Sequence, residues 1–382
     1  MSESGARLRD VFITGVGAHL PGLPIGNDRM EDHIGRVLGR DSVVGRRALR
    51  WNGIQTRHYA IAAGGAVLNT NAGMTAKAVA AALDDADLQT SAVQHLATAT
   101  TQGDYLVPGH AAAVQAELGA GPMEIASYQS VCASALMAAK GAWLQVRAGE
   151  ADVAVAAGGE FSSRWFRPAF YEGTALVDAK GRLTTEADFL RFTLSDGAGA
   201  VVMEPRPRAD GLSLKVDWID LTSLAGSFDP CMWAGSTRSD RADMASAWSH
   251  AGPIASHAAG AVALLQDFDL LKVVIRAWIG VWLQKVDSGR ITPDQVDHLL
   301  CHYSARSLRE EIVGLLRNTA AMIPEERWFS TLPETGNVGS ASIWVMLAAF
   351  MKSGRPKRGD RVLLIVPESG RAMIGFMMLE VV

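Results

Sequence analysis

The hydrophobic positions of the chain fall into short aliphatic runs that alternate with longer, alanine-rich stretches. Short runs bounded by turn residues predict buried strands, and the Ala-rich stretches predict helices, so the pattern favours an α/β protein with a buried sheet. In the first half we expect strands at Val11–Val16, His95–Thr101, Asp152–Ala157 and Gly199–Glu204, and helices at Met74–Leu88, Ala111–Leu118 and Ala133–Ala148.

The same plan begins again after the turn-prone segment Pro205–Gly211, with a strand expected at Leu212–Thr222 and helix at Ala258–Val286. Later segments keep the order of the first half: Ser340–Lys352 followed by Arg361–Gly370 repeats the helix and strand that begin at Ala133. Although α/β segments resemble one another in general, an ordered repeat predicts two similar halves, which we place at residues 1–207 and 208–382.

Composition narrows the class of protein. With 382 residues, 48% of them hydrophobic and 20% charged, the chain is expected to fold rather than to be disordered. A net charge of −4 argues against a general nucleic-acid binder. The apolar stretch Ala258–Leu283 is interrupted by four charged residues, so we expect no membrane span.

The three cysteines, Cys132, Cys231 and Cys301, are too few and too scattered for a disulfide framework or a zinc cluster. No signal-like segment precedes the first apolar run, so we expect a cytoplasmic protein. The sequence has no phosphate-binding loop, dinucleotide fingerprint or metal-ligand cluster, so neither a cofactor nor a metal is expected.

Cys132 precedes an Ala-rich helix within Ser127–Ala135. A thiol at a helix N-terminus is exposed to unpaired N–H groups and to the positive end of the helix dipole, which predicts a lowered pKa and a nucleophilic role. An inert core cysteine is the simpler interpretation of the residue taken alone.

His302 follows the apolar run His298–Cys301, and Asn337 lies in a Gly-rich turn that opens a helix. Each residue alone is typical of structural hydrogen bonding or turn chemistry. In the two-half interpretation, however, they occupy a strand end and a helix start in the second half. Pseudo-symmetry would then bring both beside Cys132.

The order of motifs resembles the β-ketoacyl-acyl carrier protein synthase III group of the thiolase fold, over nearly the whole chain. The matching motifs are Cys132, His302, Gly336-Asn337 followed by Ser340-Ala341-Ser342, Ser195–Ala200 between them and Glu368–Arg371 near the end. The resemblance implies two pseudo-symmetric halves in an αβαβα arrangement, a homodimer, and substrates bound to coenzyme A or an acyl carrier protein. It also implies that Cys132 accepts an acyl group while His302 and Asn337 hold the thioester carbonyl of the second substrate.

Departures from the family pattern indicate a different substrate. His302-Tyr303-Ser304-Ala305 stands where the family has His-Gln-Ala-Asn, and Gly336-Asn337-Val338-Gly339-Ser340 where it has Gly-Asn-Thr-Ser-Ala. Together with Ile25–Asp32 and Arg50–Tyr59, the motif at His302 resembles the subgroup that condenses two β-ketoacyl-type chains and closes a ring on the way to dialkylresorcinols.

Two further groups are candidates for the site. Glu160 follows Gly158-Gly159 at a predicted strand end, and burial near the pocket would make it an additional acid or base; a surface or dimer-contact glutamate is the simpler interpretation. The basic stretch between Arg36 and Arg57 suggests a contact for an acidic carrier protein or for phosphates, with a solvated basic face as the alternative. Its candidate binding residues are Arg46, Arg47, Arg50 and Arg57.

The leading hypothesis is therefore a ketosynthase, an acyltransferase that forms a carbon–carbon bond by Claisen-type condensation of the Cys132-bound acyl group with a malonyl or β-ketoacyl thioester. One alternative within the fold transfers the Cys132-bound acyl group to an oxygen or nitrogen acceptor, a reaction for which Asn337 would be dispensable. Another is a non-catalytic partner subunit, which would be expected to lack the nucleophile.

Overall fold

A computed structural model describes residues 8–42, 44–237 and 247–382 of the chain. The strands of its large sheet are β1 (Phe12–His19), β4 (His95–Thr100), β5 (Glu124–Gln129), β6 (Ala154–Phe161), β7 (Asp196–Glu204), β8 (Leu214–Ser223), β11 (His298–Cys301), β12 (Trp328–Phe329), β13 (Arg361–Glu368) and β14 (Met373–Val381). Two small sheets pair β2 (Ile25–Gly26) with β3 (Thr56–Arg57) and β9 (Met232–Trp233) with β10 (Leu265–Gln266).

The large sheet has an internal repeat. Its strand order is β12-β11-β13-β14-β8 followed by β1-β7-β6-β4-β5. Read from each outer edge, both halves follow the same pattern: three parallel strands, then two antiparallel ones. The halves join where Phe12 and Ile13 of β1 pair with Lys215 and Leu214 of β8. The predicted boundary at residues 207 and 208 lies in the segment that connects β7 to β8.

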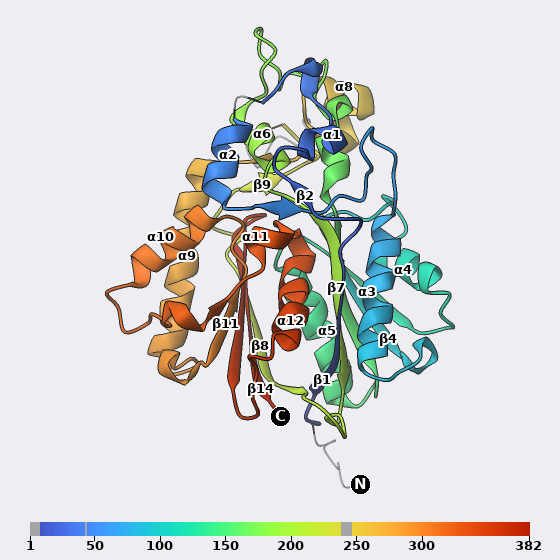
Figure 1. Cartoon of the computed structure of the whole chain (residues 1–382), viewed down its shortest axis with the longest axis vertical. Helices are drawn as coiled ribbons and strands as arrows, with labels where there is room; N and C mark the ends of the chain where they lie inside the picture. Colours follow the sequence, from blue (N-terminus) through green and yellow to red (C-terminus); the bar gives the residue numbers. More distant parts are fainter. Residues whose placement is uncertain (1–7, 43, 238–246) are drawn as a thin grey trace.

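The helices cover both sheet halves and fill the space between them (Figure 1). They are α1 (Met30–Ile34), α2 (Gly45–Asn52), α3 (Asn71–Asp85), α4 (His110–Leu118), α5 (Ser134–Ala148), α6 (Thr185–Arg191), α7 (Trp248–Ala251), α8 (Pro253–Ala258), α9 (Phe268–Asp287), α10 (Arg306–Leu316), α11 (Leu332–Thr335) and α12 (Ser342–Lys352). Figure 1 shows α3 and α4 on one flank, α9 and α10 on the other, and α5 and α12 in the middle.

Alternation along the strands explains this layering. In β6, Ala154 and Ala156 belong to the core around α5 and α12, whereas Val155 and Ala157 belong to the core under α3. A third apolar core lies between the second half of the sheet and α9. Because successive strand residues point to opposite faces, a sheet with two apolar faces must be covered on both sides. The structure thus has the α/β architecture predicted from the sequence.

One predicted element is divided in the structure. The expected helix Ala258–Val286 consists of the end of α8, a short strand at β10, and α9. Asp267 begins α9, because its carboxylate accepts hydrogen bonds from the Asp269 and Leu270 amides, both at 3.0 Å. None of the helices among the described residues is long and apolar enough to span a bilayer.

Candidate active site

Cys132 lies in the turn immediately before α5, two residues from the first helical residue, Ser134. Glu368, at the end of β13, holds this turn from the other half of the chain. Its Oε1 accepts a hydrogen bond from the Ser130 hydroxyl at 2.6 Å, and its Oε2 accepts one from the Ala133 amide at 3.1 Å. The two bonds flank Cys132, so contact between the halves fixes the position of the thiol.

The environment of Cys132 raises the pKa of its thiol, so the predicted lowering is wrong. Burial is the largest cause, and the carboxylates of Glu368 and Glu160 add to it. A helix N-terminus stabilises an anion by about 0.3–1 kcal/mol, which is small beside the effect of burying a charge. Cys132 is therefore a protonated thiol in the free protein at neutral pH, and it must lose its proton before it attacks.

His302 directly follows β11, and its backbone amide donates to the Ile365 carbonyl of β13 at 2.8 Å. The ring is buried, and its Nε2 has no hydrogen-bond partner among the residues that the structure describes. Burial lowers the pKa of His302 to about 4. The imidazole is therefore neutral at physiological pH, and in the Nε2–H tautomer it can donate to a bound oxygen.

Asn337 is fixed through both its backbone and its side chain. Its carbonyl accepts from the Ser195 amide at 2.8 Å, and its side-chain Oδ1 accepts from the Gly339 amide at 2.9 Å. These bonds occupy the acceptor end of the side-chain amide, and the described residues place no acceptor against Nδ2. Nδ2 is thus the group available to donate to a substrate.

Glu160 is buried at the end of β6 rather than exposed on the surface. Its Oε1 accepts from the Thr101 amide at 3.0 Å, the Thr101 hydroxyl at 2.7 Å and the Ser340 amide at 3.2 Å. Burial raises the pKa of this carboxyl, and the hydrogen bonds from Thr101 and Ser340 act in the opposite direction. Because three donors meet at one oxygen, Oε2 keeps acceptor capacity.

Glycines allow these elements to approach closely. A side chain at Gly158 in β6 would bring a Cβ within 2.6 Å of the Ser340 carbonyl oxygen. At Gly339, where φ is +52°, a Cβ would lie 2.9 Å from Cγ of Glu160. Gly158 therefore lets the turn that carries Asn337 pack against one face of β6, whereas Gly159 makes room for Thr75 and Asn71 of α3 on the other.

A single cavity connects the four predicted catalytic residues, Cys132, His302, Asn337 and Glu160. It encloses about 720 Å³ of space between atoms, part of it open to solvent. Its remaining walls are mostly apolar, and α9 and α10 contribute Leu271, Ile275, Trp278, Leu308 and Ile312. A thiol, a neutral imidazole and an amide donor facing an apolar pocket can accept an acyl group and stabilise an oxyanion.

Comparison with known proteins matches two stretches of the chain to family models. Residues 54–170 match the thiolase N-terminal domain, and residues 286–378 match the C-terminal domain of 3-oxoacyl-[acyl-carrier-protein (ACP)] synthase III. The first match contains Cys132 and Glu160, and the second contains His302 and Asn337. The chain belongs to the 3-oxoacyl-ACP synthase III-like family of the thiolase fold. This is a family of ketosynthase condensing enzymes.

Curated relatives cover almost the same length. The β-ketoacyl-ACP synthase III of Hyphomonas neptunium is 26% identical over 93% of this chain and 94% of the relative. The enzyme of the same name from Brucella abortus is 27% identical over 92% of this chain and 94% of the relative.

Solved structures share the fold. AbyA1, a tetronic acid condensing enzyme, has a TM-score of 0.76 at 22% identity, with 97% of this chain and 99% of that chain covered. OleA of Xanthomonas campestris with bound lauric acid and lauroyl-CoA has a TM-score of 0.71 at 19% identity, with 98% and 99% covered. The predicted thiolase fold is confirmed.

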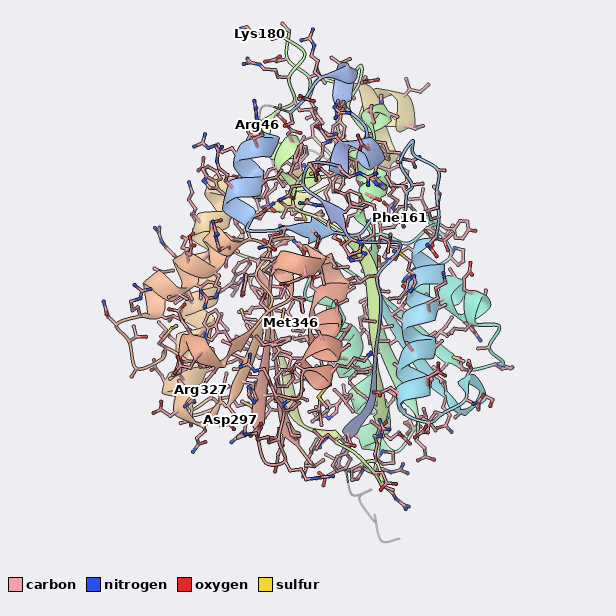
Figure 2. The ribbon with its side chains drawn as sticks, viewed as in Figure 1. Arg46, Phe161, Lys180, Asp297, Arg327 and Met346 are labelled. Carbon is pink, nitrogen blue, oxygen red and sulfur yellow. The ribbon has the colours of Figure 1, made fainter. Side chains whose placement is uncertain are left out.

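The four arginines predicted to bind an acidic carrier or phosphates differ in their exposure. Arg46, Arg47 and Arg50 are exposed on α2, and Arg46 lies on the outer side of that helix (Figure 2). The prediction is wrong for Arg57, whose side chain is fully buried. Its guanidinium donates to the Phe192 carbonyl at 2.7 Å and to the Asn27 side chain, so it holds the fold and does not face a partner.

Sequence reasoning missed the role of Glu368 in holding the nucleophile turn. In the sequence, Glu368 stands out only as part of the motif Glu368–Arg371. Its signal was a carboxylate at the end of a strongly apolar run, Val362–Pro367, where a charge is costly unless it is hydrogen-bonded. The described residues contain no group of three or more His, Cys, Asp or Glu placed to hold a metal.

Proposed function

We propose that this protein is a ketosynthase that joins a Cys132-bound acyl group to a second acyl thioester by Claisen-type condensation. The second substrate is a β-ketoacyl thioester, and the product closes to a 1,3-cyclohexanedione, the precursor of a dialkylresorcinol. The observation that carries the proposal is the meeting of the Cys132 thiol, the His302 imidazole and the Asn337 amide in one apolar cavity.

The first step acylates Cys132. The Cys132 thiol loses its proton, the thiolate attacks the thioester carbonyl, the bond between the acyl carbon and the donor sulfur breaks, and the donor sulfur takes up a proton. Because the pKa of Cys132 is raised, only a small fraction of the protein carries this thiolate at neutral pH, and the rate of attack follows that fraction. Covalent transfer divides one difficult reaction into two easier ones.

The second step forms the carbon–carbon bond. His302 and Asn337 Nδ2 donate to the thioester oxygen of the incoming substrate and stabilise the enolate as its α-carbon loses a proton. That carbon attacks the acyl carbon on Cys132, the bond to sulfur breaks, and the thiol regains a proton. An oxyanion donor such as Asn337 supports condensation over acyl transfer to an oxygen or nitrogen acceptor, which needs no enolate.

Glu160 supplies the base that a β-ketoacyl substrate requires. A malonyl substrate generates its enolate by losing carbon dioxide, whereas a β-ketoacyl substrate must give up a proton. A buried carboxylate with a raised pKa is a suitable acceptor for that proton. The new chain then contains both nucleophile and electrophile, so ring closure is intramolecular and gains effective molarities of roughly 10⁵ M or more.

The substrates reach the site on coenzyme A or an acyl carrier protein. Arg46, Arg47 and Arg50 form no ion pair with an acidic side chain among the described residues, and Arg47 lies over the Trp51 ring, 4.4 Å from its centroid, so their charges are available for phosphates or an acidic carrier. The helix that bears them, α2, packs against α10, and α10 lines the cavity through Leu308 and Ile312.

A homodimer formed through the β5 edge is part of the proposal. β5 is the last strand of the sheet, and Ile125 on it is 38% exposed. The nearby loop exposes Tyr105, Leu106 and Val107 by 64%, 70% and 83%. An uncovered strand edge beside exposed apolar side chains is suited to pairing with a second copy. Sedimentation equilibrium of the whole chain tests this directly, and a monomer at micromolar concentration contradicts it.

The test of the reaction uses intact mass and product analysis. The purified protein is incubated with a panel of acyl thioesters, and peptide mapping locates the adduct. Adding a β-ketoacyl thioester to enzyme acylated with an unsaturated chain should give a cyclic product carrying both side chains, and Cys132→Ala should abolish it.

Two outcomes contradict the proposal. An adduct on Cys231 or Cys301, with Cys132 unmodified, removes the nucleophile assignment. A linear β-ketoacyl product formed only from a malonyl substrate makes the protein a chain-initiating synthase and removes the ring-closing step.

A further inference from the structure

A second cavity adjoins the catalytic one. It comprises about 520 Å³ of space between atoms, part of it open to solvent, and lies between the outer face of the second sheet half and the helices α9 and α10. It shares four wall residues with the catalytic cavity: Ile275, Trp278, Ile312 and Pro367. The two spaces are therefore neighbours that meet at the ends of β11 and β13.

Neighbouring residues of β11 and the turn after it line the two cavities. Cys301 lines the second cavity, and His302 lines the catalytic one. Cys301 and His302 are adjacent in the chain, so this strand end lies at the boundary between the two spaces. The second cavity thus begins one residue from the imidazole proposed to hold the second substrate.

The walls of the second cavity are almost wholly apolar, and the buried indole N–H of Trp278 has no hydrogen-bond partner among the described residues. All of its lining residues are aliphatic or aromatic apart from Cys301, a weak hydrogen-bonding group whose pKa burial raises to about 12. The indole N–H of Trp282 donates to the Ala321 carbonyl at 3.1 Å, and that of Trp328 donates to the Ile323 carbonyl at 2.9 Å. These donors are thereby occupied by the protein. A site of this kind retains water poorly and favours hydrocarbon.

We propose that this apolar cavity, lined by Trp278, Trp282 and Trp328, binds the alkyl tail of the second substrate while its thioester carbonyl lies at His302 and Asn337. The inference rests on the proposed function, since it names the substrate as one with a long aliphatic chain. The walls of this cavity come from the second half of the chain, which also supplies His302 and Asn337. Cys132 comes from the first half, so its acyl chain is assigned to a different part of the catalytic cavity.

The first experiment fills the second cavity. Ala321 is buried in its wall, and Ala320 next to it is exposed, so Ala321→Phe and Ala320→Phe form a matched pair. Condensation is measured with β-ketoacyl thioesters of increasing chain length. In the unaltered protein, kcat/KM should rise roughly fourfold for each methylene that enters the cavity. Ala321→Phe should remove that rise and leave short substrates unaffected, whereas Ala320→Phe should match the unaltered protein.

Short substrates also control for folding, because a variant that retains their turnover is correctly folded. If Ala321→Phe fails that control, the milder Ala321→Leu takes its place. Equal loss for short and long substrates in Ala321→Leu, or a loss that appears only in the chain-length series for acylation of Cys132, overturns the assignment.

The second experiment requires no turnover. Cys132→Ala is titrated with a pantetheine thioether of a long alkyl chain that carries bromine near its end, a quencher of tryptophan fluorescence. Quenching should be strong, and replacing Trp282 and Trp328 by Phe should remove most of it. Trp143→Phe, in the separate core around α5, should leave it unchanged.

The two experiments separate the cavity from the reaction. Quenching that depends on Trp282 and Trp328 without any condensation product supports the cavity and removes the proposed function. Condensation that proceeds equally with all chain lengths, without such quenching, supports the function and overturns the cavity.

Discussion

Asn337 offers the sharpest test of the proposed chemistry, because its side chain has an acceptor and a donor whose roles can be separated. Oδ1 accepts from the Gly339 amide at 2.9 Å and shapes the turn, and Nδ2 is the proposed oxyanion donor. Asn337→Ala removes both groups. Asn337→Asp keeps the acceptor and removes the donor, so the pair of variants distinguishes the turn from the chemistry.

The expected magnitude follows from these contacts. Losing one oxyanion donor lowers a rate by about 10²–10³, equivalent to about 2.7–4 kcal/mol. Losing the hydrogen bond to Gly339 lowers stability by about 0.5–1.5 kcal/mol. The backbone bonds of Asn337 to Thr193 and Ser195 do not involve the side chain, so both variants should fold. Asn337→Asp should condense at least as slowly as Asn337→Ala, because its negative charge opposes the oxyanion.

The assay separates the two half-reactions. Enzyme is first acylated on Cys132, with the extent read by intact mass, and is then mixed with the second substrate for a single turnover followed by mass spectrometry. Acylation should stay within a few-fold of the unaltered protein, while condensation falls by the factor above. The reasoning is refuted if Asn337→Asp condenses normally, which would make Asn337 a turn residue, or if acylation falls in parallel.

Three further predictions follow from the charges around the site. The rate of Cys132 acylation should rise by close to tenfold per pH unit between pH 6 and 8, because the pKa of the thiol lies above that range. His302→Ala should keep this slope. If the rate instead levels off with pH in the unaltered protein and does not level off in His302→Ala, His302 is the base. Glu368→Gln removes a negative charge that raises the pKa of Cys132. Acylation at a fixed pH should therefore become faster, by up to about tenfold for each unit by which the pKa falls. Slower acylation would show that the hydrogen bonds from Glu368 to the turn matter more than its charge. Replacing the exposed residues Arg46, Arg47 and Arg50 by alanine should raise KM for carrier-bound substrate more than it lowers kcat, and added salt should lower the activity of the unaltered enzyme. The control replaces Lys352, Lys357 and Arg358, near the start of β13, by alanine. An equal rise in KM in that control would show that net charge, and not the position of the arginines, causes the effect.

Stability should also depend on pH through His302. In the unfolded chain this side chain binds a proton near its ordinary pKa of 6.5, whereas in the folded protein it does so only near 4. The unfolded state therefore holds more protons between these values, and the free energy of unfolding should fall as the pH drops from 6.5 to 4. His302→Gln should lose that part of the dependence in urea titrations, and an unchanged profile would contradict the burial of a neutral imidazole.

The sequence by itself determined the elements and their repetition. Apolar runs such as His95–Thr101 and the Ala-rich stretch at Ala133–Ala148 correspond closely to β4 and α5, because strand and helix periodicity are local properties of the chain. The ordered motifs around Cys132, His302 and Asn337 were also visible in the sequence, because their spacing follows from the elements that carry them.

Tertiary structure decided the properties that depend on residues distant in the chain. Arg57 lies in the basic stretch yet is fully buried, whereas Glu160 lies in the catalytic cavity and not on the surface. The pKa of Cys132 follows from its burial and from Glu368, which is far away in sequence, and not from the adjacent helix. The apolar cavity behind His302 exists only where α9 and α10 cover the sheet. Burial and electrostatic environment are summed over neighbours in space, so local sequence patterns cannot determine them.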